Sequence, residues 1–263
     1  MTAGTFAWPD DSQGAVSLTY DDGLPVHLSV VAPLLDRHGL RATFYPMIQS
    51  DLQLHPEGWK ALAAAGNELG NHSVFHPCRQ RSPNPYKWLD DRYDLAHYSL
   101  DQMRAELEIA NLVLHLLDDR EARSYGCTCG DLSVGTGVLE VPLQPIFTDL
   151  FVAARGTVTN EAAHPGPGLD LYNIGCIDVA GRRLPDLQRL VEGARLTGGW
   201  AVFVVHGIGA GTHELYLEAG VHEEFVGWLA QQTRIWTAPV RAVAAYVRDH
   251  VSSLQRLGGA PQA

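Results

Sequence analysis

Short apolar runs alternate with helix-like patterns along the whole chain, and this alternation restricts the fold most. Ala15–Thr19 has the composition of a buried strand, and His27–His38 then places apolar residues at helical spacing before a stop at Gly39. This repetition predicts parallel strands covered by helices, as a barrel or a doubly wound sheet. We expect further strands at Ala42–Tyr45, Glu68–Asn71, Phe151–Ala154, Leu171–Ile177 and Ala201–Val205, and helices at Glu57–Ala65, Leu100–Leu117, Pro185–Leu196, His222–Gln232 and Pro239–Val251.

The chain length fits one domain. A chain of 263 residues is within the usual size of a single α/β barrel, and neither an internal repeat nor a linker divides it. We therefore expect one domain over residues 1–263, with a core at about 15–250 and a loose tail at 252–263. The turn-rich segment Pro77–His97 is longer than a simple connection between two elements needs to be. Its length favours a loop that shapes a site.

The balance of charge limits the partners. A formal net charge of −11 argues against nucleic acid and anionic membranes, because both bind basic surfaces. No apolar run reaches the roughly 18 residues of a membrane span. The first residues lack the basic and apolar segments of a signal peptide. We expect a soluble protein with a neutral or cationic substrate, although a leader absent from this sequence would still allow export.

The cysteines give little guidance about compartment. There are four, Cys78, Cys127, Cys129 and Cys176, at irregular spacing. Cys127 and Cys129 lack the two-residue spacing of a zinc knuckle. Buried free thiols are therefore the default expectation for all four.

Two adjacent carboxylates follow the first predicted strand. They belong to Thr19–Gly23, which reads Thr-Tyr-Asp-Asp-Gly. Barrel enzymes hold their sites at the carboxyl ends of strands, so these carboxylates are candidates for catalysis. Asp and Gly are also common in turns, and this segment alone favours a simple turn.

Two histidines follow a later strand and strengthen the case for a site. His72 and His76 stand four residues apart in Gly70–His76. On one helical turn both rings would point the same way, which suits metal binding. With one carboxylate from the first motif they would form a two-histidine, one-carboxylate site that is open to water and substrate. Such a site suits zinc or another divalent metal acting as a Lewis acid.

A third polar position ends a buried strand. Trp200–Gly209 is apolar up to His206, and glycines follow. A histidine in this place suits the role of proton donor to a leaving group. A structural histidine bonded to the backbone is the equal alternative.

Together, Thr19–Gly23, His72–His76 and Val205–His206 resemble the motifs of the polysaccharide deacetylase family. This is the fourth carbohydrate esterase family, which contains nodulation-factor, chitin, peptidoglycan and xylan deacetylases. The resemblance runs from about Ala15 to Tyr246. It implies a distorted (β/α) barrel with about seven parallel strands, fewer than the eight of a full barrel.

The resemblance also implies a role for each matching residue. Asp22, His72 and His76 would be the metal ligands, Asp21 the general base and His206 the general acid. We expect one divalent ion, zinc first, with cobalt, nickel or manganese as alternatives. Ligand distances to zinc would be about 2.0–2.2 Å.

The third family motif departs from the usual pattern in this chain. The family usually has an Arg, a Pro and a Gly there, and a subgroup reads Arg-Thr-Phe-Ala-Tyr-Pro-Cys-Gly-Asp. Arg123–Asp131 reads Arg-Ser-Tyr-Gly-Cys-Thr-Cys-Gly-Asp. Gly126 stands at the usual Arg position and Thr128 at the usual Pro position, so neither role transfers. The resemblance leaves Cys129 as the residue whose backbone N–H faces the oxyanion.

Two further residues are candidates for supporting roles. The missing arginine normally pairs with the catalytic base, and Arg155, at a predicted strand end, is a candidate to replace it beside Asp21. An ordinary surface arginine is the equal alternative. Asp178, which ends another strand, is a candidate to orient His206. A turn residue at a strand end is the alternative there.

The long loop is rich in aromatic residues. They are Tyr86, Trp88, Tyr93 and Tyr98. Aromatic faces pack well on sugar rings, so this loop is a candidate platform for a carbohydrate. Packing of the loop onto the barrel explains the same residues equally well.

The resemblance leaves three functional hypotheses. The first is N-deacetylation of an amino-sugar polymer or oligomer. The second is O-deacetylation of acetylated xylan or a similar glycan, which the same site would perform. The third is a carbohydrate-binding relic without catalysis, against which the retention of all five catalytic positions argues. Members of the family are often extracytoplasmic, whereas this chain shows no leader.

Overall fold

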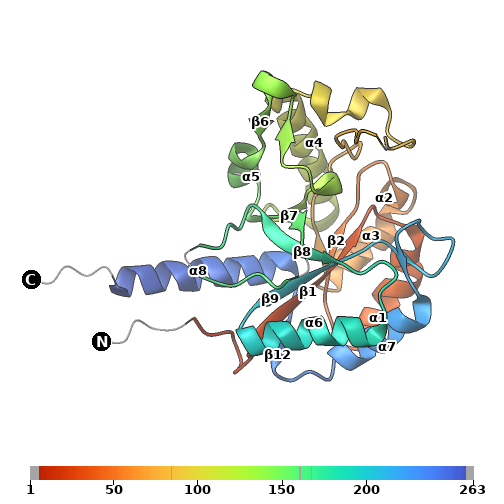
Figure 1. The fold of residues 1–263 in the computed structure, drawn as a ribbon. Helices are drawn as coiled ribbons and strands as arrows, with labels where there is room; N and C mark the ends of the chain where they lie inside the picture. The colour runs from red at the N-terminus through yellow and green to blue at the C-terminus, as the bar shows by residue number, and fades with distance from the viewer. Residues whose placement is uncertain (1–5, 84, 160, 167, 259–263) are drawn as a thin grey trace, which may run out of the picture.

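The computed structural model of the chain describes residues 6–83, 85–159, 161–166 and 168–258. Within these residues, eight strands form one sheet that helices surround (Figure 1). The strands of the sheet are β1 (Gly14–Asp21), β2 (Thr43–Tyr45), β3 (Glu68–Leu69), β4 (Ser124–Gly126), β7 (Ala153–Val158), β8 (Ile174–Asp178), β9 (Trp200–Val205) and β12 (Ile235–Thr237). Two short pairs lie outside it, β5 (Ser133–Val134) with β6 (Val141–Pro142), and β10 (Gly207–Ile208) with β11 (Tyr216–Leu217).

Helices connect most of the strands of the sheet. The α-helices are α1 (Ala32–Arg37), α2 (Asp51–Leu54), α3 (Pro56–Ala64), α4 (Leu100–Asp118), α5 (Gln144–Leu150), α6 (Leu184–Thr197), α7 (Ala219–Leu229) and α8 (Val240–Gly258). A π-helical turn at His27–Val31 precedes α1, so the expected helix His27–His38 is present in two parts. The change occurs next to Pro33, which has no N–H to continue a regular ladder.

The sheet is parallel and curls into a barrel. Its strand order is β3-β2-β1-β9-β8-β7-β4, with β12 paired to β1, and every one of these pairings is parallel. The curl brings the two ends together. The N–H of Asn71, two residues beyond β3, donates to Ser124 at 2.9 Å, and that of Gly126 donates to Asn71 at 3.0 Å. The predicted distorted barrel is therefore confirmed, and its seam closes beside His72.

Side chains of β1 alternate between two environments. One set joins the apolar cluster beneath α1, α3, α6 and α7, and consists of Val16, Leu18 and Tyr20. Successive side chains of a strand point to opposite faces. The residues between them therefore point into the barrel, where they are buried: Ser17, Thr19 and Asp21. This polar inner row leads directly to the mouth of the barrel.

Some predicted bounds need correction. The strand expected at Phe151–Ala154 begins only at Ala153, because Phe151 ends α5 and stacks on Tyr125 with 5.2 Å between ring centroids. Phe151 is apolar because it packs against Tyr125, and it is not part of the strand. The strand expected from Leu171 begins at Ile174. Helix α8 continues to Gly258 and includes most of the tail expected to be loose, while residues 259–263 lie outside the described residues.

Gly70 offers a test of the barrel seam. A Cβ atom at this position would overlap the buried ring of Tyr45 and lie 3.1 Å from the carbonyl oxygen of Ser124. We expect Gly70→Ala to lower the free energy of unfolding by about 1–3 kcal/mol, because extra volume in a packed interior forces shifts. Urea denaturation would measure the change.

The control is Gly193→Ala in α6, where a Cβ would meet nothing within 4 Å. Alanine is the better helix former, so this variant should equal the wild type or gain up to about 1 kcal/mol. Equal unfolding free energies for the two variants would contradict the tight seam.

Candidate active site

Three side chains converge at the mouth of the barrel. Asp22 follows β1, and His72 and His76 follow β3. The Nε2 atoms of His72 and His76 lie 3.5 and 3.3 Å from Oδ1 of Asp22. Their possible ligand atoms all lie within 4.8 Å of one another. The structure therefore brings together the three residues that the sequence predicted as metal ligands.

The loop that carries the two histidines is not helical. Ser73 and His76 have left-handed backbones, with φ of 67° and 54°. Local bonds hold this shape, because the N–H of Ser73 donates to Oδ1 of Asn71 at 2.7 Å and the N–H of His76 donates to Oγ of Ser73 at 2.9 Å. The helical turn expected for His72 and His76 is therefore wrong, and an irregular loop brings the two rings together.

Glu106 of α4 fixes this loop through its carboxylate. Its Oε1 accepts the N–H groups of Val74 and Phe75 at 3.2 and 3.0 Å, and the hydroxyl of Tyr98 donates to its Oε2 at 2.9 Å. Burial raises the pKa of Glu106, and these donors oppose the rise. Sequence reasoning missed this residue. Its signal is a carboxylate one helical turn after Met103, on the apolar face of the helix.

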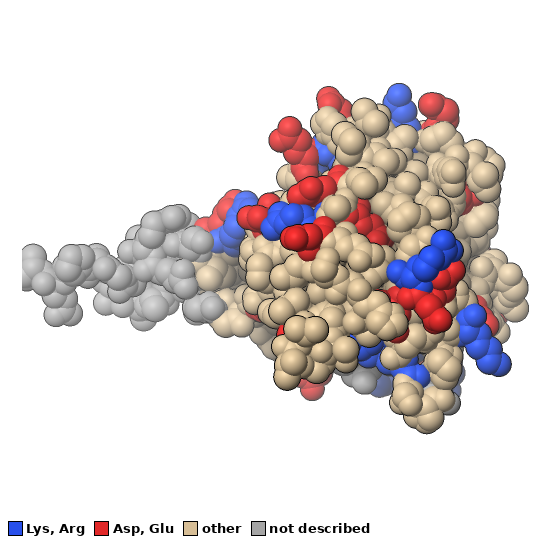
Figure 2. Space-filling view, turned by 90° about the horizontal axis from the view of Figure 1, so that it is seen from above, with Lys and Arg blue, Asp and Glu red and all other residues tan. Residues whose placement is uncertain are grey.

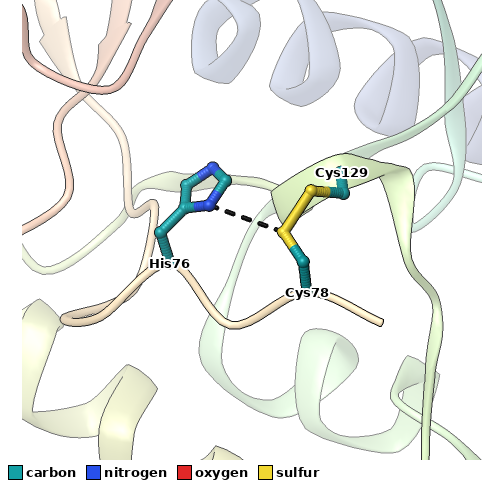
Figure 3. A group of neighbouring side chains, drawn as sticks. All are labelled: His76, Cys78 and Cys129. Atoms are coloured by element: carbon teal, nitrogen blue, oxygen red, sulfur yellow. Dashed lines mark hydrogen bonds between the residues drawn. A yellow bond between two sulfur atoms is a disulfide. The ribbon is translucent and has the colours of Figure 1, made fainter. Parts of the chain in front are cut away.

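Contacts at Nδ1 decide which nitrogen of each ring faces Asp22. Nδ1 of His72 donates to the carbonyl of Gly126 at 2.7 Å, so its Nε2 carries the lone pair. Nδ1 of His76 lies 3.5 Å from Sγ of Cys78 (Figure 3). Burial lowers the pKa of His76 to about 4, although the charge of Asp22 opposes this. Neutral rings oriented in this way are suited to metal binding.

The carboxylate of Asp22 has one oxygen without a donor. Its Oδ1 is buried and has no hydrogen-bond partner among the described residues. Burial would raise the pKa of Asp22, but His72 and His76 hold it well below its usual range. A buried ionised oxygen is costly unless a cation or donors compensate it. Two imidazole nitrogens and one carboxylate oxygen suit zinc, so these residues fit a divalent metal.

Arg155 of β7 binds Asp21 with both of its terminal nitrogens. Nη1 donates to Oδ1 at 2.8 Å and Nη2 to Oδ2 at 2.6 Å, and Nη1 also donates to Thr19 at 2.9 Å. The side chains of Arg155 and Asp21 are 3% and 4% exposed. Burial would raise the pKa of Asp21, but Arg155 lowers it below its usual value. Arg155 thus lies where the sequence predicted it, and it is not a surface arginine.

Gly126 explains how an arginine from a neighbouring strand reaches this place. Gly126 and Arg155 are register partners in the β4–β7 pair. A Cβ atom on Gly126 would lie 3.1 Å from Nη2 of Arg155 and 3.0 Å from the ring of Tyr45. The guanidinium lies over that ring, 5.0 Å from its centroid. The missing side chain at Gly126 therefore leaves the space that Arg155 occupies.

His206 follows β9 and turns Nε2 toward Asp21, 4.0 Å from Oδ2. Its Nδ1 is buried and has no hydrogen-bond partner within the described part of the chain. The expected pairing of Asp178 with His206 is therefore wrong. Oδ1 of Asp178 instead accepts the N–H of Ala180 at 2.9 Å, which is the turn role that the sequence left as the alternative. His27 supports His206 from elsewhere, because its Nε2 donates to the His206 carbonyl at 2.9 Å.

A disulfide joins two loops of the site. It links Cys78 to Cys129 beside His76 (Figure 3). The expectation of free thiols is wrong for this pair and confirmed for Cys127 and Cys176, which are free and buried. The bridged cysteines are 51 residues apart, so only the fold reveals that they meet. The loop after His76 and the loop that presents Cys129 are therefore one covalent unit.

The long loop places two of its aromatic rings at the site and two in packing roles. The ring of Trp88 lies 5.5 Å from that of His76 and 5.1 Å from that of Tyr86. Trp88 is 56% exposed. Tyr93 stacks on a neighbouring phenylalanine, and Tyr98 is buried. A sugar platform is therefore possible only for Tyr86 and Trp88, and the packing interpretation applies to the other two.

The surface agrees with the acidic composition. Figure 2 shows acidic side chains in several groups on the face drawn, with separate basic side chains among them and no broad basic area. The formal net charge of the chain is −11. Within the residues that the structure describes, no helix combines the length and apolar character needed to cross a membrane.

Comparison with known proteins links this geometry to a family. Residues 9–136 match the family model described as polysaccharide deacetylase. Similar curated proteins include a gellan lyase from Bacillus sp., 24% identical over 218 residues. Another is the peptidoglycan-N-acetylmuramic acid deacetylase PdaC from Bacillus subtilis (strain 168), 36% identical over 73 residues. The matches cover 76% and 27% of this chain but only 8% and 15% of those proteins.

Solved structures agree on the fold. A Mycobacterium smegmatis protein assigned to the polysaccharide deacetylases has a TM-score of 0.67 at 15% identity, over 95% of both chains. A CE4 family pseudoenzyme from Bacillus anthracis has a TM-score of 0.54 at 14% identity, over 88% of this chain and 65% of the other. At such identities the likeness concerns the fold alone. Residues 9–136, just under half of the chain, thus match the polysaccharide deacetylase family, and the solved structures share the fold of the chain.

Proposed function

We propose that this protein is a metal-dependent hydrolase that removes acetyl groups from a carbohydrate, by N-deacetylation of an amino-sugar polymer or oligomer. The convergence of Asp22, His72 and His76 carries the proposal. Oδ1 of Asp22 is buried and accepts no hydrogen bond from the described residues, so it is free to bind a cation. These three would hold one divalent ion, zinc first. When bound, such an ion supplies Lewis-acid polarisation of the acetyl carbonyl and of the attacking water.

Asp21 is suited to take the proton of the attacking water. Arg155 donates to both of its oxygens, which keeps the carboxylate ionised and fixes its plane. Oδ2 of Asp21 also lies 3.9 Å from Nε2 of His72, so the base faces the metal ligands. The base and the ligand set therefore share one reaction centre.

His206 is suited to protonate the leaving nitrogen as the carbon–nitrogen bond of the acetamide breaks. Its Nε2 lies on the Asp21 side of the site. An amide requires this acid more than an ester does, because an amine anion is a poor leaving group. The backbone N–H of Cys129 is our candidate donor to the oxyanion, since the disulfide to Cys78 holds its loop beside His76.

Trp88 is suited to receive a sugar ring. It is exposed, and Tyr86 stacks on it with 26° between the ring planes. Because Trp88 also contacts His76, a sugar on its face would lie next to the ligand set. PdaC, by its name, acts on N-acetylmuramic acid, which favours an N-acetyl sugar over an O-acetyl one.

A screen of acetate release tests the function. Purified protein loaded with zinc or cobalt would be assayed on N-acetylglucosamine oligomers, peptidoglycan and acetylated xylan. Metal-dependent release from an amino-sugar substrate is the expected result. Acetate release from acetylated xylan alone would show that the protein is an O-acetyl esterase and not an N-deacetylase. A protein that binds no metal and releases no acetate would instead be a carbohydrate-binding relic.

Two neighbouring carboxylates allow a matched test of the roles. We expect Asp21→Asn to lower kcat by about 10²–10⁴-fold, the usual contribution of a general base, with metal binding kept. Asp22→Asn, one residue further, should lose metal affinity because it removes a ligand. Metal content after dialysis and acetate release would be measured for both. Turnover like the wild type in Asp21→Asn would overturn the assignment of the base.

Arg155 should control the acidic limb of the pH profile. Arg155 lowers the pKa of Asp21, and the ionised base works above that pKa. Arg155→Ala should therefore move the acidic limb of kcat/KM to higher pH. Arg155→Lys should restore it only in part, because an ammonium cannot reproduce the planar fork.

The measurement needs folded protein, since removing one partner of a buried pair typically costs about 3–5 kcal/mol of stability. Circular dichroism would verify the fold of each variant before the pH series is run with excess metal. An unchanged acidic limb in folded Arg155→Ala would contradict this role of the arginine.

A further inference from the structure

Another histidine, His213, lies against the site on the far side of Asp22. Its Nε2 is 3.5 Å from Oδ2 of Asp22, whereas His72 and His76 face Oδ1. His213 is not part of the group formed by the three candidate ligands. The two oxygens of one carboxylate thus have different neighbours, two ring nitrogens on one side and His213 on the other.

The contacts of His213 decide where its proton lies. Its Nδ1 accepts the N–H of Leu215 at 3.0 Å. The carbonyl of Leu215 lies 3.3 Å from the same nitrogen but already accepts the N–H of Gly207 at 3.0 Å, so Nδ1 is assigned as the acceptor. A neutral imidazole that accepts at Nδ1 carries its proton on Nε2, which here is directed at Asp22. The distance of 3.5 Å is long for a hydrogen bond. Hydrogen bonds of active sites often tighten only in the complex with substrate.

Backbone pairing and a close approach at Gly207 hold the loop that carries His213. β10 and β11 pair, and the N–H of Gly207 donates to Leu215 at 3.0 Å. A Cβ atom on Gly207 would lie 2.8 Å from Cβ of His213, so glycine is required for the loop to fold back. The ring of His213 then stacks on His206, with 5.1 Å between centroids and 11° between planes.

We propose that His213 is a positioning residue that holds Oδ2 of Asp22 through Nε2–H, so that Oδ1 is turned toward the metal. Its ring also covers one face of His206 and restricts the rotation of that side chain. The inference rests on the metal site proposed above. Partners behind metal ligands typically change metal affinity or activity by about 10–100-fold, which is the size of effect expected here.

Three substitutions separate the parts of this role. His213→Ala removes both donor and ring, His213→Phe keeps the ring, and His213→Gln keeps an N–H donor at similar reach. Zinc affinity would be measured by competition with a chromogenic chelator, at one pH and with folding checked by circular dichroism. We expect about 10–100-fold weaker binding in the Ala and Phe variants and near-complete rescue by Gln. The control is His250→Ala, which removes an exposed histidine of α8 and should leave the affinity unchanged.

X-ray absorption of the cobalt-loaded protein separates a positioning residue from a ligand. The proposal requires the same number of histidine nitrogens around cobalt in the wild type and in His213→Ala. Loss of one nitrogen in that variant would make His213 a ligand and overturn the proposal. Zinc affinity like the wild type in both the Ala and the Phe variant would overturn it as well. A wild-type chain that binds no zinc would refute the metal site itself, which is a separate outcome.

Discussion

The ion pair between Arg155 and Asp21 is the interaction on which the site depends. Neither charge is stable alone at 3–4% exposure, and each is satisfied by the other in a two-pronged contact. In the sheet, β8 and β9 separate the strands of the two residues, so the contact crosses the inside of the barrel. The pair therefore both joins the two walls and fixes the carboxylate that we propose as the base.

Adjacent aspartates acquire different tasks from the backbone. Asp21 is the last residue of β1 and continues its inward row, where Arg155 reaches it. Asp22 has a left-handed conformation, with φ of 72°, which redirects its side chain toward the histidines. Aspartate tolerates this conformation better than most residues. The end of the strand thus separates a candidate base from a candidate ligand without any intervening residue.

Local patterns explain what the sequence could predict. The barrel follows from the alternation of strands and helices, and Arg155 was predictable because Gly126 lacked the usual guanidinium. Two of the failures concern contacts between distant segments. Asp178 caps a turn instead of reaching His206, and Cys78 meets a cysteine in another loop. Such contacts depend on how loops fold over the barrel mouth, which periodicity does not describe.

The seam of the barrel has a consequence for cooperativity. Asn71 makes the backbone bonds that close β3 against β4, and His72 follows it and donates to Gly126 across the same seam. Opening the seam would separate His72 from its partner, so we expect the three candidate ligands to separate when the barrel opens there. Any ion or substrate held by His72 would favour the closed barrel by mass action. Binding at the barrel mouth and closure of the seam between β3 and β4 are therefore coupled.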